Sequence, residues 1–286
     1  MENILEDTKN IMRRYNIRAN KSLGQNFLIN SEVVENIISS SEISKEDMII
    51  EIGPGLGTLT KYLLEKAGKV LCIELDSKMI KILQDRFSNY QNFEIINEDV
   101  LKVDLNKIIK TNKENEKIKN VKIVANLPYY ITTPIIMKLL EEKLDIESIT
   151  VMIQKEVADR LIETPGGKNT GAITYTVYYY CESEKIMEVP NSSFIPEPEV
   201  TSEVIKMTLR NKPAVDIENT KVMFMIIKSA FMQRRKTLLN ALTNTKVFMS
   251  KQEGIEILKK LNLDENVRAE NLTLQDFANI AKIICK

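Results

Sequence analysis

The tetrapeptide Asn126-Leu127-Pro128-Tyr129 combines residue types that suit methyl transfer to a planar amino group. It directly follows residues 121–125, an apolar run that predicts a buried strand. The exocyclic amine of a base is a poor nucleophile because its lone pair is delocalised into the ring. Two acceptors facing its N–H groups would favour a more pyramidal nitrogen. The side-chain oxygen of Asn126 and the carbonyl of Leu127 could supply them.

The other two residues of the tetrapeptide favour the same chemistry. Pro128 biases Leu127 toward extended geometry and so stiffens the carbonyl of that residue. Tyr129 offers an aromatic face on which a base taken out of its helix could stack. The alternative is an ordinary turn at the end of a strand, since Asn and Pro are common turn residues.

A glycine turn lies upstream, in a pattern typical of nucleotide binding. Residues 48–52 predict a strand, Gly53 and Gly55 follow it directly, and a helical pattern begins near Thr58. The next apolar run reaches Glu74, about 20 residues after the glycines, where an acid would meet ribose hydroxyls. No lysine followed by serine or threonine comes after the glycines, so the turn is not a phosphate-binding P-loop.

The glycines alone could form a purely structural turn. The order of the whole set is stronger evidence for a cofactor site: the glycine turn, then Glu74, then a further acid at Asp99, and finally Asn126.

Composition excludes several kinds of chemistry. The 286 residues suffice for one large domain and a small one, and 43% of them are hydrophobic, as expected of a folded chain. The absence of histidine excludes Ser-His triads, histidine metal sites and histidine general bases. Methyl transfer from a sulfonium needs no strong base, because the amine proton becomes acidic as the N–C bond forms.

The three cysteines are widely spaced and predict neither a disulfide framework nor a metal site. With no membrane-spanning run and no signal-peptide pattern, we expect a cytoplasmic protein.

The net charge is zero, but its distribution is uneven. Residues 213–286 carry 12 Lys and Arg against 8 Asp and Glu, which gives this part +4 and the remainder −4. Arg234, Arg235 and Lys236 fall within a helical pattern over residues 222–242. They would then lie at or beyond the edge of the core-facing side of this helix, available for nucleic-acid phosphates. The alternative is an ordinary solvated helix face, which the residues alone favour.

The distribution of patterns predicts two domains. Strand and helix patterns alternate from Met48 to about Ile153, which indicates βα units and a parallel sheet. Residues 174–180 are rich in Thr, Val and Tyr and predict a further strand. The pattern is helical after Lys212-Pro213, so we expect domains over residues 1–212 and 213–286.

Seven segments of the chain, in this order, resemble a known family. They are KSLGQNFL at 21–28, EIGPGLGTLT at 51–60, NLPYYIT at 126–132, MIQKEVADRL at 152–161, FIPEPEVTS at 194–202, AFMQRRKTLLN at 230–240 and RAENL at 268–272. The chain is similar to the ribosomal RNA adenine N6,N6-dimethyltransferases of the kasugamycin-resistance type. These enzymes modify small-subunit RNA, and the resemblance covers nearly the whole length.

The resemblance implies an α/β fold: a Rossmann-like methyltransferase domain that uses S-adenosylmethionine and has a seven-stranded, mostly parallel sheet. It also implies a small C-terminal, all-helical domain that binds RNA. The family's substrate is a pair of adjacent adenines near the 3′ end of small-subunit (16S) ribosomal RNA, dimethylated within an assembling 30S particle. We expect a monomer with no membrane partner and no metal.

The resemblance also assigns site residues. The positions that match cofactor contacts are Asn26 and Leu28, which close over S-adenosylmethionine, Gly53 and Gly55 at its methionine side, Glu74 at its ribose, and Asp99 and Val100 at its adenine. Asn126 would touch both the cofactor and the target base, beside Leu127. Tyr129 and Phe194 resemble the pair that sandwiches the flipped adenine.

Three alternatives are open. A large-subunit RNA dimethyltransferase of the macrolide-resistance type shares the fold and the Asn-x-Pro-Tyr type of motif, but residues 53–60 and 230–236 favour the small-subunit type. A DNA adenine methyltransferase is disfavoured because no separate sequence-reading domain is visible. A non-catalytic ribosome-assembly or transcription factor could keep the fold, although the intact motifs argue against a loss of catalysis.

Overall fold

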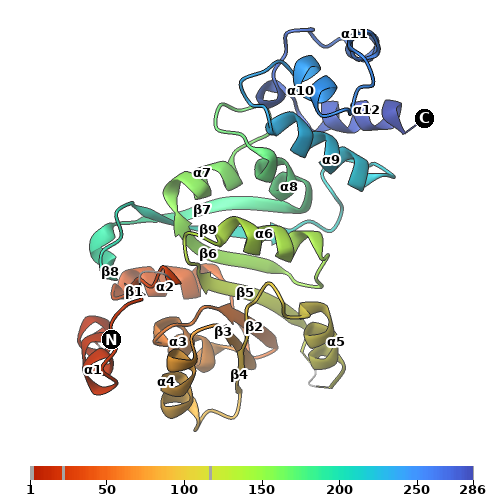
Figure 1. The fold of residues 1–286 in the computed structure, drawn as a ribbon. Helices are drawn as coiled ribbons and strands as arrows, with labels where there is room; N and C mark the ends of the chain where they lie inside the picture. Colours follow the sequence, from red (N-terminus) through yellow and green to blue (C-terminus); the bar gives the residue numbers. More distant parts are fainter. Residues whose placement is uncertain (1–2, 21–22, 116–117, 286) are drawn as a thin grey trace. The chain divides into compact units, whose positions relative to one another are not determined.

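The structure is a computed structural model that describes residues 3–20, 23–115 and 118–285 (Figure 1). Its strands are β1 Phe27–Leu28, β2 Asp47–Ile52, β3 Lys69–Glu74, β4 Phe93–Asn97, β5 Asn120–Asn126, β6 Ser148–Gln154, β7 Cys181–Val189, β8 Phe194–Ile195 and β9 Ser202–Leu209. Its helices are α1 Ile4–Arg14, α2 Ser31–Ser40, α3 Thr58–Lys66, α4 Ser77–Phe87, α5 Leu105–Asn115, α6 Thr132–Glu141, α7 Lys155–Ile162, α8 Ala172–Tyr180, α9 Thr220–Phe231, α10 Leu238–Asn244, α11 Lys251–Lys260 and α12 Leu274–Ile284.

Seven strands form one sheet in the order β4-β3-β2-β5-β6-β9-β7. The four pairs from β4 to β6 are parallel, and β9 runs antiparallel to β6. The expected seven-stranded, mostly parallel sheet is therefore confirmed. A separate two-stranded antiparallel sheet pairs β1 with β8.

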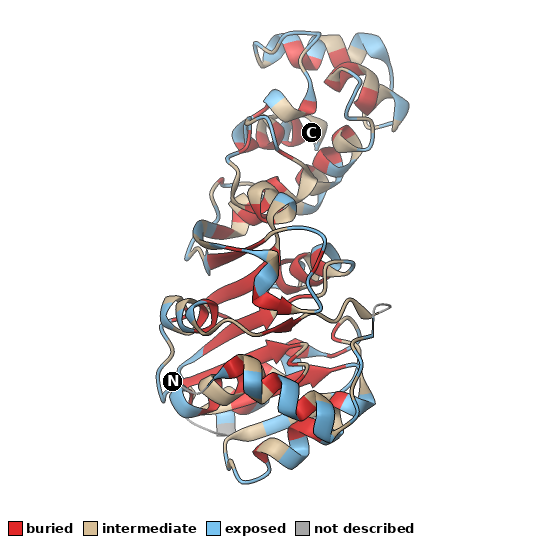
Figure 2. Cartoon of the chain, turned by 90° about the vertical axis from the view of Figure 1, so that its left-hand side faces the viewer, coloured by how far each residue is buried: buried red, intermediate tan, exposed pale blue. Residues whose placement is uncertain are grey.

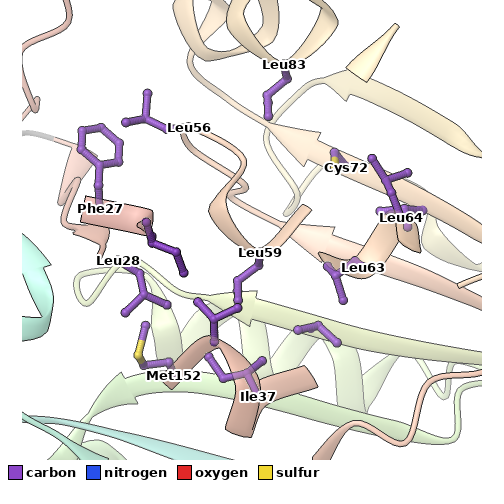
Figure 3. Close-up of a cluster of buried hydrophobic side chains, with 14 of the residues drawn as sticks. Phe27, Leu28, Ile37, Leu56, Leu59, Leu63, Leu64, Cys72, Leu83 and Met152 are labelled. Atoms are coloured by element: carbon purple, nitrogen blue, oxygen red, sulfur yellow. The ribbon is translucent and has the colours of Figure 1, made fainter. Parts of the chain in front are cut away.

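The central strands are buried along most of their length, and Figure 2 shows them largely in red. All six residues of β2 are buried. A strand covered on both faces forms a near-continuous apolar run, which explains why these segments were recognisable in the sequence. Side chains of β2, β3 and β5 form one buried cluster with residues of α2, α3 and α4, part of which Figure 3 shows around Leu59 and Leu63.

The order of the strands brings three sequence motifs to one edge of the sheet. The glycine turn follows β2, Glu74 ends β3 and Asn126 ends β5. Because β2 lies between β3 and β5 and pairs with both in parallel, the carboxyl ends of these strands are neighbours. Ligands of open α/β sheets bind at this edge.

The chain divides into two compact units. One contains Met1–Ala158 and Ser183–Leu209, and the other contains Asp159–Glu182 and Arg210–Lys286. The break at residue 210 falls close to the boundary expected between residues 212 and 213. That expectation did not include residues 159–182, which group with the C-terminal helices. Among the described residues, no helix has the length and apolar character that crossing a membrane requires.

The predicted strand over residues 174–180 is wrong, because this segment belongs to helix α8. Tyr175 is fully buried in the second unit, with its ring 5.1 Å from that of Phe277 of α12. Its hydroxyl donates a hydrogen bond of 2.7 Å to the carbonyl of Leu272. Packing against other helices overrides the local preference of Thr, Val and Tyr for strands.

Candidate active site

A cavity lies at the carboxyl ends of β2, β3 and β5, within the unit that contains the sheet. It is lined by ten of the residues that sequence analysis assigned to catalysis or cofactor binding: Asn26, Leu28, Gly53, Gly55, Glu74, Asp99, Val100, Asn126, Leu127 and Tyr129. Residues a hundred positions apart in the sequence thus share one concave surface, which makes this cavity the candidate active site.

The glycine turn forms one wall of the cavity. Gly55 has φ +57°, a left-handed conformation that side-chain-bearing residues rarely adopt. A β-carbon at this position would lie 3.5 Å from the ring of Phe27, which also lines the cavity. That distance is an ordinary van der Waals contact, so the left-handed φ is what favours glycine, and in this conformation the backbone N–H of Gly55 donates to the carboxylate of Glu74.

Glu74 is the buried acid of the site. Its Oε2 accepts a hydrogen bond of 3.1 Å from the backbone N–H of Gly55, and its Oε1 accepts one of 2.8 Å from the N–H of Asp76. Burial raises the pKa of Glu74, while the two backbone donors oppose that shift. Each carboxylate oxygen has a second lone pair, so Glu74 can also accept hydrogen bonds from hydroxyl groups of a ligand.

A short strap over residues 23–28 covers part of the cavity. Gln25 Nε2 donates a hydrogen bond of 2.9 Å to Asp76 Oδ2, just beyond β3. The backbone carbonyl of Asn26 accepts one of 3.2 Å from Asn126 Nδ2, at the end of β5. The strap is thereby tied to both neighbours of β2. Sequence reasoning did not identify Gln25, although it stands next to the predicted Asn26.

The chain turns sharply after Asn126. The carbonyl of Pro128 accepts hydrogen bonds from Ile131 N at 3.2 Å and from Thr132 Oγ1 at 3.1 Å. Tyr129 occupies the turn, and its hydroxyl lies 2.5 Å from Ser202 Oγ. Burial raises the pKa of Tyr129, which keeps the phenol neutral at ordinary pH. The turn fixes the backbone of Tyr129 near Asn126, and the contact with Ser202 fixes the hydroxyl end of its side chain.

Phe194 does not line the cavity. Its side chain is only 1% exposed and belongs to the same buried cluster as Leu59 and Leu63, and Phe194 pairs with Leu28 in the β1–β8 sheet. A base could stack on this ring only after the ring had left the core, which the loss of buried apolar area opposes. In this conformation Tyr129 lines the cavity without Phe194, and the assignment of Phe194 to base stacking stays a prediction.

Glu51 is a site residue that sequence reasoning missed. It lies in β2, lines the cavity and is 1% exposed. Burial raises its pKa to about 7, although Thr60 Oγ1 donates a hydrogen bond of 2.6 Å to its Oε2. A carboxyl group in the otherwise apolar run of residues 48–52, directly before the glycines, was the signal that could have revealed it.

The basic residues of the second unit are not on a helix edge as predicted. Helix α9 ends at Phe231 and α10 begins at Leu238, so Arg234, Arg235 and Lys236 lie in the intervening turn. The break is fixed by Thr237, the N-cap of α10, whose hydroxyl accepts from the N–H of Asn240.

These three side chains also differ from one another. Arg234 Nη2 donates a hydrogen bond of 3.0 Å to the carbonyl of Thr170 and lies 3.9 Å from Glu270 Oε2. All three residues are exposed, but Arg234 is held by these contacts and supports the loop before α8. The contact of Arg235 and Lys236 with a nucleic acid stays a prediction.

The fold and the cavity define a Rossmann-like methyltransferase. A crystal structure of a dimethyladenosine transferase from Plasmodium falciparum matches with a TM-score of 0.73 and 27% identity, over 89% of this chain and 95% of that one. The structure of the 23S rRNA methyltransferase ErmE, at 20% identity, shares the fold with a TM-score of 0.67, over 91% of this chain and all of that one.

Sequence comparison narrows this class. The model of the family described as ribosomal RNA adenine dimethylase matches residues 16–286. A ribosomal RNA small subunit methyltransferase A from Alkaliphilus metalliredigens is 49% identical, over 96% of this chain and 95% of its own length. A protein of the same name from Clostridioides difficile is 46% identical, over 97% of this chain and 94% of its own length. The chain therefore belongs to the ribosomal RNA adenine dimethylase family and is an enzyme.

Proposed function

We propose that this enzyme transfers methyl groups from S-adenosylmethionine to N6 of two adjacent adenines near the 3′ end of small-subunit ribosomal RNA. The observation that carries the proposal is the placement of Asn126 and Tyr129 in one cavity with the glycine turn and Glu74. The relatives named small subunit methyltransferase match nearly the whole chain at 46–49% identity, and this favours small-subunit RNA as the substrate.

The residues of the cavity fit S-adenosylmethionine. The left-handed backbone at Gly55 aims its N–H at Glu74, and the buried carboxylate of Glu74 suits the two hydroxyls of a ribose. Asp99 and Val100 line the same cavity and offer one polar and one apolar side chain to an adenine ring. When bound, the cofactor supplies an electrophilic methyl group on a sulfonium.

Asn126 orients the target amine in this proposal. Its Nδ2 is used by the carbonyl of Asn26, which keeps Oδ1 as the acceptor for an N–H of the base. The carbonyl of Leu127, stiffened by Pro128, accepts from the second N–H. As the new N–C bond forms, the nitrogen becomes acidic and its proton leaves to solvent, so a chain without histidine can carry out the step.

Tyr129 holds the extracted base. Its hydroxyl is fixed by Ser202, so the ring presents a constant face to the cavity. Residues 213–286 would bind the RNA, with Arg235 and Lys236 on its phosphates. We place the reaction in the cytoplasm, on an assembling 30S particle, with the enzyme acting as a monomer.

The substrate can be tested with labelled cofactor. The enzyme is incubated separately with unmethylated small-subunit particles, protein-free large-subunit RNA and duplex DNA, and the digested nucleosides are separated by mass. We expect N6,N6-dimethyladenosine from the particles alone, on two adjacent residues. Label in the large-subunit RNA would establish the macrolide-resistance type of activity instead. No label in any substrate, with cofactor bound, would favour a non-catalytic assembly factor.

A further inference from the structure

Tyr130 is an exposed aromatic side chain at the rim of the candidate active site. It lines the same cavity as Tyr129, yet 57% of it is exposed. Among the described residues it is the one aromatic side chain with such exposure. The other aromatics of the cavity wall differ, since Phe27 is 6% exposed and Tyr129 is half-buried. A single exposed tyrosine is ordinary on a protein surface, so its setting decides what it does.

The turn after Asn126 separates the two tyrosines. Tyr129 and Tyr130 occupy the two central positions between Pro128 and Ile131, whose carbonyl and N–H are hydrogen-bonded at 3.2 Å. The hydroxyl of Tyr129 reaches Ser202, whereas the ring of Tyr130 packs toward Gly24. Consecutive residues therefore offer one ring within the cavity and one at its rim.

The strap supports the ring of Tyr130 from one side. A β-carbon on Gly24 would lie 3.3 Å from Tyr130 Cδ1 and 3.5 Å from its Cε1, so the glycine lets the ring and the strap approach closely. The carbonyl of Gly24 accepts a hydrogen bond of 3.3 Å from Asn26 Nδ2, and Asn26 is itself tied to Asn126. The ring is thus backed by protein and open to solvent elsewhere.

Extraction of a base creates a need that this ring can meet. A nucleotide that leaves the stack uncovers one face of its neighbour, and unstacking is a main cost of base flipping. A supported aromatic ring next to the pocket can cover that face, and every base stacks on such a ring. We propose that Tyr130 stacks on the nucleotide that flanks the target adenine. It would thereby position adjacent adenines for successive methylation.

This inference rests on the proposed function, and the experiment separates the two. Tyr130→Phe keeps the ring, Tyr130→Leu keeps apolar bulk against Gly24, and Tyr130→Ala removes both. We expect KM for unmethylated small-subunit particles to rise about tenfold in the Leu and Ala variants and to stay within twofold in the Phe variant. The kcat at saturating particles and the Kd for S-adenosylmethionine should change less than twofold. Particles modified by the Leu and Ala variants should accumulate with one adenine dimethylated.

A matched control is Leu75→Ala, which removes a 51% exposed apolar side chain from the same cavity, next to Glu74. Its effect should appear in cofactor affinity, with particle KM within twofold of wild type. A wild-type particle KM in Tyr130→Leu would overturn the inference, since apolar packing against the strap would then be enough for RNA binding. An equal rise of particle KM in Leu75→Ala, or unchanged KM in Tyr130→Ala, would also overturn it. If wild-type enzyme fails to methylate the particles, the proposed function fails first.

Discussion

Asn126 Nδ2 donates a hydrogen bond of 3.2 Å to the backbone carbonyl of Asn26, which lies a hundred residues earlier in the chain. This contact joins the end of β5 to the strap over residues 23–28 and fixes which end of the amide faces the strap. It therefore gives the side chain an orientation as well as a position. The chemistry assigned to Asn126 depends on that orientation, because only Oδ1 can accept from an amine.

Asn126→Ala should lower the turnover number by about 10²-fold or more, the usual cost of removing one preorganised polar group. Single-turnover methylation at saturating particles measures this loss. Asn126→Asp is the informative companion, because it keeps an acceptor but cannot donate to the Asn26 carbonyl. We expect it to be similarly impaired. Wild-type turnover in the Ala variant would exclude Asn126 from the chemical step.

Glu74→Ala should weaken S-adenosylmethionine binding at least tenfold, since hydrogen bonds to a charged group contribute about 1.5–3 kcal/mol each. Calorimetric titration measures the affinity, and circular dichroism checks the fold. Glu65→Ala, which removes an exposed acid of α3 outside the cavity, serves as control and should bind normally. Equal affinities for wild type and the Glu74 variant would remove this residue from the site.

Glu51 should make stability depend on pH. Its pKa is raised to about 7 in the folded protein, so the folded state keeps a proton that the unfolded chain loses above about 4.5. The contribution of Glu51 to the free energy of unfolding is therefore full below pH 4.5 and is lost as the pH rises to about 7. The loss amounts to about 3 kcal/mol.

Urea unfolding of wild type and Glu51→Gln between pH 4.5 and 8 measures this effect. The variant cannot ionise at residue 51. The difference between its free energy of unfolding and that of wild type should therefore shift in favour of the variant as the pH rises and level off above 7. Glu65→Gln, at an exposed position of α3, should follow the wild-type profile. Parallel curves for wild type and Glu51→Gln would contradict the raised pKa.

Phe194→Ala should lower the free energy of unfolding by about 3–5 kcal/mol, as expected for a buried aromatic side chain. Chemical denaturation measures this, and Phe194→Leu should be much less destabilised. Wild-type stability together with poor capture of the target base in Phe194→Ala would support the predicted stacking role instead.

Arg235 and Lys236 should contribute to RNA binding through charge. Changing both to Ala should weaken binding to small-subunit particles and reduce the slope of log affinity against log salt by about one for each lost phosphate contact. Lys259 and Lys260, two exposed lysines of α11, provide a double variant with the same change of net charge. That variant should keep the wild-type slope, and binding of free S-adenosylmethionine should change in neither.

Arg234→Ala tests the contrast within the same turn. Because Arg234 donates a hydrogen bond to the Thr170 carbonyl, its loss should lower the melting temperature of the protein. The slope of log affinity against log salt should change little. An undiminished slope in the Arg235 and Lys236 double variant would assign these two residues to an ordinary solvated turn.

The sequence by itself determined the sheet and most of the cavity. Strand β2 is buried along its whole length and β5 over residues 121–125, so their apolar runs are visible without a structure. The glycines, Glu74 and Asn126 each stand at a strand end, and parallel pairing brings strand ends together. The order of these residues along the chain was enough to predict that they share one edge of the sheet, and all of them line the cavity.

Other features were decided by tertiary structure, because they depend on contacts between distant segments. The helix over residues 172–180 forms where Tyr175 packs on Phe277, against its local preference. Phe194 is buried because β8 pairs with β1, which no spacing in the sequence reveals. The raised pKa of Glu51 and the orientation of Asn126 likewise arise from burial and from a partner far along the chain. Sequence patterns record which residues are present at a strand end, and packing decides their exposure, charge and direction.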